Sequence, residues 1–489
     1  MEIRSLSFKI EEATVADMQE AMKSEELTSV KLVSMYLERI AAFDKQGVSL
    51  NSVLEINPDA LAIAESLDAE RKLKGSRGPL HGIPVMLKDN IDTGDKMHTS
   101  AGSLALANSY APDDSFVAKK LREAGAVILG KVNMTEFANY KTRGMPGGYS
   151  SRGGQVLNPY KPGVFGTGGS SAGSGVSVAA NLTALAIGTE TSGSILSPAY
   201  NNSVVGIKPT VGLISRDGII PLAHSQDTAG PIARTVADAA AMLGVLTGVD
   251  EKDPITGTSI DKSYTDYTIF LDKDGLKGAR IGIPRAYYYS TITDEENKLM
   301  NTVIDDLKAQ GAIIVDNADI PSAVELSEFQ STVFKHEFKS DINAYLESLG
   351  PNASVRSLSD IITFDINDIA HNLKYGDVLL TESNSTSGTL TEPQYIMDRL
   401  KDLRLSRDEG IDYVMHKYDL DALLFPNTTG AAIAAKAGYP SITVPAGYTA
   451  DGKPVAATFT AGAYSEPTLI RVAFSFEQAT HYRKAPALT

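Results

Sequence analysis

The 489-residue chain contains no cysteine and only seven histidines. The missing cysteine excludes disulfides, thiolate metal sites and hydrolysis by a cysteine nucleophile. The histidines stand far apart, at positions 81, 98, 224, 336, 371, 416 and 481, and form neither H-E-x-x-H nor H-x-H. A histidine-rich metal site is therefore not expected, and we expect chemistry without a metal.

Positive charge is also scarce. The chain has 45 Lys and Arg against 60 Asp and Glu, a formal net charge of -15, and no long basic run. This balance argues against nucleic acid or an anionic membrane as the main partner and favours a small-molecule or peptide substrate. No apolar stretch approaches the roughly 18 residues of a membrane span, and the first residues lack an apolar signal segment. We expect a cytoplasmic protein, unless the chain is a processed form.

Helical patterns alternate with short apolar runs along much of the chain. DDSFVAKKLREAG leads into AVILG, TDEENKLMNTVIDDLKAQG into AIIV, and EGIDYVMHKYDLD into ALLFP. A helix followed by a fully apolar strand is typical of a mostly parallel sheet covered on both faces. The predicted fold class is therefore α/β.

The outer parts of the chain differ from this alternating pattern. Apolar residues recur at helical spacing over residues 14–43, with Thr28 or Ser29 as the expected cap, which predicts an N-terminal helical layer within about residues 1–75. Residues 321–407 are more polar and mostly helical in pattern, and we expect a variable substrate-side helical region over about 321–420. No linker of Pro, Ser or charge runs flanks this region, so we predict one domain over residues 1–489.

Residues 166–175 read GTGGSSAGSG. Glycine costs conformational entropy on folding, so this run indicates a sharp turn or a close approach of the backbone. A phosphate-binding loop would need Lys and then Ser or Thr after the glycines, and that pair does not follow. Gly169, Ser171 and Gly173 match G-x-S-x-G, the nucleophile elbow, which needs a later acid and His. The third possibility is that the loop supplies serines to a site completed elsewhere in the chain.

Two further segments place polar residues beside apolar strands. Lys88 ends the apolar run of HGIPVMLKDNID, and GTETSGSILSPA, residues 188–199, contains a turn around Gly193. Taken alone, Lys88 is a strand-end charge that reaches solvent, and the turn is a tight connection. Taken with the serine loop, the segments could supply the nucleophile, the base and the oxyanion donors of amide hydrolysis. Lys88 could be the base if burial keeps it neutral, and residues 191–194 could form the oxyanion hole.

At this point the sequence resembles the amidase signature hydrolases, which use a Ser, cis-Ser, Lys triad. The resemblance is carried, in family order, by GIPVMLKDNIDTGD, GGSSAGSGVSVAANLTALAIGTETSGSILSPA, GIKPTVGLISRDGIIPLAHSQDTAGPIARTVADAAAML and AGYPSITVPAG. It implies that family's fold, a large mixed and mostly parallel twisted sheet with helices on both faces, and a signature core over about residues 80–250. RGGQVLNPY, with SRDGIIPLAHSQDTAGP, is most similar to the peptide-amidase-like branch.

The resemblance also assigns roles to residues. It implies Ser194 as the nucleophile, Ser170 as a bridging serine preceded by a cis peptide, and Lys88 as the base. The Ser170 hydroxyl is expected within hydrogen-bond distance of both the Lys88 amine and the Ser194 hydroxyl. The supporting residues that it implies are Ser171, which helps to hold the network, and the oxyanion donors Thr191, Ser192 and Gly193, together with Ser194. It implies no cofactor and no metal.

Three positions depart from the usual family pattern. Glu190 stands where Asp is frequent and is expected to substitute conservatively. Ser192 replaces a frequent glycine, which bears on the fine geometry of the oxyanion hole. Leu196 stands where many members carry Arg, so a contact made by that Arg is not expected here.

The resulting prediction is an enzyme that hydrolyses a carboxylic amide through a serine acyl-enzyme, acting as a monomer or homodimer. The amide would be a small amide or a C-terminal peptide amide, and the products an acid and ammonia or an amine. The alternative is the A-type glutaminase subunit of a tRNA-dependent amidotransferase, which the acidic charge and RGGQVLNPY disfavour. A catalytically silent binding protein and an α/β-hydrolase esterase with Ser171 as nucleophile are two further alternatives.

Overall fold

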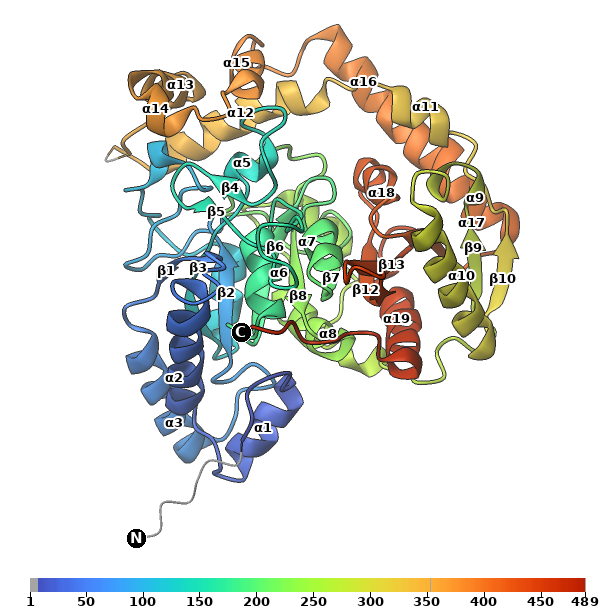
Figure 1. Ribbon diagram of the computed structural model, residues 1–489. Coiled ribbons are helices and arrows are strands. Elements are labelled where there is room, and N and C mark those ends of the chain that lie inside the picture. Colours follow the sequence, from blue (N-terminus) through green and yellow to red (C-terminus); the bar gives the residue numbers. More distant parts are fainter. Residues whose placement is uncertain (1–7, 352, 489) are drawn as a thin grey trace.

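The computed structural model describes residues 8–351 and 353–488, and one sheet of 11 strands runs through its centre (Figure 1). In spatial order its strands are β1 (Val53–Ile56), β3 (Val127–Val132), β2 (Pro84–Lys88), β6 (Leu185–Glu190), β8 (Thr228–Ala233), β7 (Val205–Lys208), β12 (Ser441–Tyr448), β13 (Pro454–Thr460), β11 (Ala422–Pro426), β9 (Arg280–Ile283) and β10 (Ile313–Asp316). A separate two-stranded sheet joins β4 (Tyr149–Ser150) to β5 (Gly154–Gln155).

The sheet is mixed, as the resemblance implied, and its parallel pairs fall into two groups. β2 pairs in parallel with β3 and β6, and β9 pairs in parallel with β11 and β10. The other six neighbouring pairs of this sheet, within the described residues, are antiparallel. Parallel pairing therefore holds in these two groups and not between them, because strands such as β12 and β13 are joined by a short hairpin turn rather than by a helix.

Both faces of the sheet are covered, as predicted. Every residue of β2, β3, β6 and β8 is buried, and neighbouring residues of a strand point to opposite faces. The helices that pack on the strands are α3 (Ala60–Lys74), α4 (Phe116–Glu123), α6 (Ala172–Ala179), α7 (Leu196–Asn201), α8 (Val236–Leu246), α10 (Asp294–Ala309) and α19 (Glu466–Thr480). No helix in the described ranges is long and apolar enough to cross a membrane.

Residues 14–43, predicted from their helical spacing, begin with two separate helices rather than one continuous helix. The Thr14 side chain accepts a hydrogen bond from the Asp17 N–H at the start of α1 (Val15–Lys23), and Thr28 accepts one from the Lys31 N–H at the start of α2 (Ser29–Arg39). These side chains satisfy N–H groups that the first turn of a helix leaves unpaired. Of the two expected caps for the second helix, Thr28 is therefore the one used.

The polar region after residue 321 builds its own apolar cluster. Its helices are α11 (Ala323–Glu328), α12 (Val333–Ser348), α13 (Leu358–Asn367), α14 (Ile369–Asn372), α15 (Val378–Asn384) and α16 (Pro393–Leu403). Phe338, Ile342 and Leu380 pack there against Phe137 and Tyr140, apart from the main core. The remaining α-helices of the described residues are α5 (Glu136–Asn139), α9 (Arg285–Tyr288), α17 (Asp412–Tyr418) and α18 (Ala431–Ala437). Figure 1 shows α12 and α16 arching across the top of the molecule, above α5 and α18.

Buried polar contacts fasten this helical region to the sheet side. The Lys141 amine lies 2.8 Å from Glu136 Oε1 and 3.1 Å from Asp365 Oδ2, a carboxylate of α13. The Tyr345 hydroxyl on α12 donates to Asp92 Oδ1 at 2.8 Å. Because buried polar groups are costly when unpaired, these contacts favour one placement of the helical region over the core.

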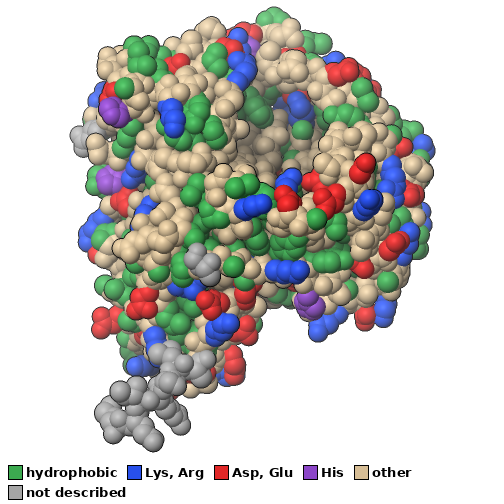
Figure 2. All heavy atoms as spheres, viewed as in Figure 1, with side chains coloured by type: hydrophobic (Ala, Val, Ile, Leu, Met, Phe, Trp, Pro, Cys, Tyr) green, Lys and Arg blue, Asp and Glu red, His purple; other side chains and the backbone are tan. Residues whose placement is uncertain are grey.

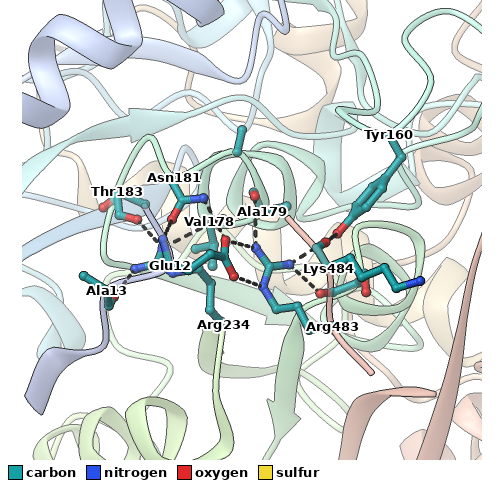
Figure 3. A network of polar contacts seen from close by, with 12 residues as sticks. Glu12, Ala13, Tyr160, Val178, Ala179, Asn181, Thr183, Arg234, Arg483 and Lys484 are labelled. Atoms are coloured by element: carbon teal, nitrogen blue, oxygen red, sulfur yellow. Dashed lines mark hydrogen bonds and ion pairs between the residues drawn. The ribbon is translucent and has the colours of Figure 1, made fainter. Parts of the chain in front are cut away.

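A network of polar contacts around Arg483 holds the end of the chain on the core (Figure 3). Two nitrogens of its guanidinium donate to Glu12 at 2.8 Å each. Arg483 also donates to the carbonyls of Ala179, at the end of α6, and Ser203, just after α7. The C-terminal segment thus ties the N-terminal segment to the ends of α6 and α7, the two helices that follow the serine-bearing turns.

Replacing Arg483 by Ala is expected to lower the free energy of unfolding by about 3 kcal/mol, because Glu12 and two carbonyls lose a charged donor. Lys484→Ala is the matched control, since the hydrogen bonds of Lys484 in the network are made by its backbone N–H and carbonyl, and its amine lies 5.5 Å from the centre of the Tyr448 ring. Thermal and urea unfolding of both variants measure the effect. Equal stability of Arg483→Ala and the wild type would show that the network does not anchor the segment.

Candidate active site

Lys88 lies at the end of β2, in the interior of the sheet. Its side chain is 0% exposed. The Nζ atom lies 2.7 Å from Ser170 Oγ, 2.8 Å from Thr189 Oγ1 and 3.1 Å from the Thr189 carbonyl oxygen. The expectation from position alone, a strand-end charge that reaches solvent, is therefore wrong, because parallel neighbours and covering helices bury both sides of β2.

Burial changes the protonation of Lys88. Loss of hydration lowers the pKa of the Lys88 amine to about 7, although the negative charges of Asp227 and Glu190 act in the opposite direction. Charged amines are disfavoured in a medium of low dielectric constant, and this effect dominates here. A large share of Lys88 is thus neutral near pH 7 and can accept a proton from the hydroxyl beside it.

The serine loop brings Ser170 to this amine. The Gly169–Ser170 peptide is cis, as the resemblance implied. A Cβ at Gly169 would lie 2.5 Å from Thr135 Oγ1, and one at Gly173 would lie 2.3 Å from the Asn133 carbonyl oxygen. The glycines therefore allow a close approach of the loop to residues 133–135, and this contact holds Ser170 beside Lys88.

Ser194 lies in the turn between β6 and α7, where Gly193 has a φ of 81°. Ser194 is 6% exposed, and its carbonyl accepts a hydrogen bond from the Ser171 N–H at 3.1 Å, which joins the two serine turns. Its hydroxyl makes no hydrogen bond within the described ranges. Of the two contacts expected for Ser170, the structure contains the one to Lys88 and not the one to Ser194.

Glu190 organises this turn. Its carboxylate accepts the N–H groups of Gly193 at 2.7 Å, Ile195 at 2.8 Å and Leu196 at 3.0 Å. The Gly193 N–H was expected as an oxyanion donor. It already donates to Glu190, so it is not available for that role. Within the described part of the chain, the N–H groups of the other three expected donors, Thr191, Ser192 and Ser194, have no hydrogen-bond partner.

The two other supporting residues hold the backbone around the site. Ser171 Oγ donates to the Thr189 carbonyl at 3.1 Å and accepts the Thr189 N–H at 3.2 Å. Thr191 Oγ1 donates to Asp227 Oδ1 at 2.5 Å. Ser171 is fully buried, and no hydrogen bond joins it to a histidine in the described residues, so the nucleophile-elbow interpretation fits this geometry poorly.

Known proteins match this chain over almost its whole length. The family model described as Amidase matches residues 31–470. The chain belongs to the amidase family. It is 44% identical to native peptide amidase from Stenotrophomonas maltophilia, with a TM-score of 0.92 over 99% of this chain and 100% of that one. It is 42% identical to a probable amidase of Arabidopsis thaliana, over 99% of this chain and 93% of the relative.

A more distant relative belongs to the alternative class. The chain is 32% identical to the A-type subunit of the glutamyl-tRNA(Gln) amidotransferase from Pseudomonas aeruginosa, over 98% of this chain and 99% of that one. The higher identity to amidases favours the main prediction over the glutaminase alternative. The protein is accordingly an amidase, an enzyme that hydrolyses carboxylic amides.

Within the described residues of this amidase, three side chains of the types that bind metal ions lie together: His224, Glu337 and Asp341. The imidazole Nδ1 lies 2.9 Å from Asp341 Oδ2, whereas Nε2 lies 3.6 Å from Glu337 Oε1. One potential ligand atom of each residue lies within 4.8 Å of the others, and His224 pairs with both carboxylates in this structure. Burial disfavours the imidazolium, but the hydrogen bond to Asp341 and the charge of Glu337 outweigh it and raise the pKa of His224. The cluster is an ion pair that joins α12 to the loop before β8.

Two residues of the amidase site make contacts that the sequence did not indicate. Glu190 was expected only to replace Asp conservatively, and its hold on three N–H groups is a finding of the structure. Asp227 lies inside a quoted motif without an assigned role, yet it accepts the Thr191 hydroxyl and the Leu222 and Ala223 N–H groups. Burial raises the pKa of Asp227 to about 6.

Replacing Glu190 by Ala is expected to lower kcat of the amidase about 100-fold with a smaller change in KM, because the turn that positions Ser194 loses its acceptor. Steady-state ammonia release measures both constants. Glu190→Asp is the conservative control and should retain part of the rate. A Glu190→Ala variant with wild-type kcat would show that the carboxylate does not position the turn.

Proposed function

We propose that this amidase hydrolyses C-terminal amides of peptides and small amides, with Ser194 as nucleophile, Ser170 as proton bridge and Lys88 as base. The observation that carries the proposal is the 2.7 Å contact between Ser170 Oγ and the Lys88 amine, made by a lysine that is 0% exposed. A buried amine with a pKa of about 7 beside a hydroxyl is a suitable general base at neutral pH.

The proposed reaction passes protons along these three groups. Lys88 takes the Ser170 proton, and Ser170 takes the Ser194 proton as Ser194 Oγ attacks the amide carbonyl carbon. The N–H groups of Thr191, Ser192 and Ser194 are the donors proposed to stabilise the negative oxygen of the tetrahedral intermediate. The C–N bond then breaks, and the network returns the proton to the leaving nitrogen as ammonia or an amine. Water attacks the remaining ester by the same proton path, which releases the acid and free Ser194.

The substrate proposal rests on relatives. A peptide amidase 44% identical to this chain has been solved in complex with the competitive inhibitor chymostatin. The same branch is the one that RGGQVLNPY resembles. We therefore favour a peptide amide, whose leaving group is ammonia, over a free amino acid amide such as glutamine.

The purified chain alone should release ammonia from an N-acetylated tripeptide amide and much more slowly from L-glutamine. Coupled ammonia detection gives kcat/KM for both substrates, with and without ATP. Glutamine hydrolysis that exceeds peptide-amide hydrolysis, and that increases with ATP and a partner protein, would favour the amidotransferase alternative instead.

A further inference from the structure

A positively charged cavity lies beside the candidate active site of this acidic chain. Its volume is about 490 Å³, and the lining residues that matter here are Arg216, His224, Glu337, Tyr395, Arg399 and Arg407. Figure 2 shows a hollow below α12 and α16, the helices that carry Glu337 and Arg399, with Lys or Arg atoms inside it. Four cationic side chains and one carboxylate among these residues indicate a site for negative charge.

Two of the cations are already neutralised. Arg216 Nη2 lies 2.5 Å from Asp253 Oδ1, and His224 lies between two carboxylates. Arg399 and Arg407 have no carboxylate within ion-pair distance in the described parts of the chain. Both are only half-buried. The excess charge of the cavity therefore belongs to these two arginines.

The two arginines differ in how far their donors are used. Arg407 donates to the Ala437 carbonyl through Nε at 2.8 Å and Nη2 at 2.6 Å. Arg399 makes one long hydrogen bond, 3.4 Å from Nη1 to the Lys436 carbonyl. A guanidinium has five N–H donors in a planar fork that matches a carboxylate, so Arg399 keeps most of its donors for a ligand.

Helix α18 sets the distance from this cavity to the nucleophile. Its first residue, Ala431, has its Cβ 3.6 Å from the position of a Cβ at Gly193, and its last carbonyls contact the arginines. Seven helical residues span about 10 Å. Because the contacts of 3.6 Å and 3.4 Å at the two ends of the helix add to this length, the free donors of Arg399 lie about 10 to 17 Å from the turn that carries Ser194.

We propose that this cavity is a subsite for a carboxylate on the acyl part of the substrate, bound by Arg399 with help from Arg407. The inference rests on the proposed function, in which ammonia leaves and only the acyl part extends from Ser194. An extended peptide advances about 3.3 Å per residue. Two residues advance about 7 Å, and the Glu side chain adds to this reach, so a Glu two residues before the amidated residue brings its carboxylate into the range of the arginines.

Three peptides that differ only at this position test the subsite: N-acetyl-Glu-Ala-Leu-amide and its Gln and Lys analogues. The wild type should hydrolyse the Glu peptide with kcat/KM about 10-fold above the Gln peptide, through KM, with the Lys peptide slowest. The preference should shrink as NaCl is raised, since salt screens a half-exposed pair. Arg399→Gln should bring the Glu to Gln ratio close to one, and Arg399→Lys should retain part of it.

Arg404→Gln is the matched control, because Arg404 is 45% exposed and pairs with Glu409 outside the cavity. It should keep the full Glu preference. Equal kcat/KM for the three peptides in an active wild type would overturn the subsite and leave the peptide-amidase proposal standing. A Glu preference that Arg399→Gln leaves unchanged would show that Arg399 only caps α18. Hydrolysis of none of the peptides, with small amides still cleaved, would overturn the peptide substrate itself.

Discussion

Replacing Ser194 by Ala is expected to lower kcat for amide hydrolysis by on the order of 10⁴ to 10⁶, because the acyl-enzyme can no longer form. The fold should be retained, since no hydrogen bond of the Ser194 hydroxyl is present in the described residues. Ammonia release at high enzyme concentration measures the residual rate, and thermal unfolding checks the fold.

Two serine variants serve as controls for this prediction. Ser192→Ala keeps the backbone N–H that we assign to the oxyanion and should retain most of the rate. Ser171→Ala removes contacts to the Thr189 backbone and should lower the rate without abolishing it. An inactive Ser171→Ala beside an active Ser194→Ala would instead support the nucleophile-elbow interpretation.

Replacing Lys88 by Met is expected to lower kcat about 100-fold to 10⁴-fold, the usual contribution of a general base. Met fills a similar volume but has no lone pair to accept the Ser170 proton. Lys88→Arg should be equally impaired, because a guanidinium stays protonated at any accessible pH. Activity of Lys88→Arg near the wild-type level would show that a fixed positive charge, not a base, is required.

The pH profile tests the same role in the intact enzyme. Only neutral Lys88 can accept a proton, and burial places its pKa at about 7. The value of kcat/KM should therefore rise tenfold per pH unit below about 7 and level off above it. The residual activity of Lys88→Met should lack this limb, and a limb that persists in the variant would assign the ionisation to another group.

Much of the site could be predicted because its serines lie in glycine-rich turns and Lys88 ends an apolar strand, patterns that are visible in the sequence. The glycines around Ser170 and Ser171 indicated a close approach, and the structure identifies the groups approached as Thr135 and Asn133. The pairing of Lys88 with Ser170 joins residues 82 positions apart; the residues alone suggested Lys88 as a base for a serine, and the family resemblance identified Ser170 as its partner. The resemblance also implied the cis peptide, for which the local pattern carries no signal.

The remaining features depend on distances that a sequence does not contain. Whether the Glu190 carboxylate reaches the N–H of Gly193 is decided by the geometry of one turn, so the donor set of the oxyanion hole was partly wrong. Strand order likewise follows tertiary packing, although Asp451 and Gly452 in the β12–β13 turn were an available hairpin signal. Arg399 becomes notable only because folding leaves it without a carboxylate partner in the described residues.

Covalent labelling tests the central claim most directly. The enzyme is treated with a serine-reactive organophosphonate until amidase activity is lost, and the modified residue is located by mass spectrometry of its peptides. The account predicts one phosphonyl group per chain on Ser194, and no labelling at that position in Lys88→Met over the same time. Labelling of Ser171, or full inactivation with Ser194 unmodified, would contradict the assignment of Ser194 as the nucleophile.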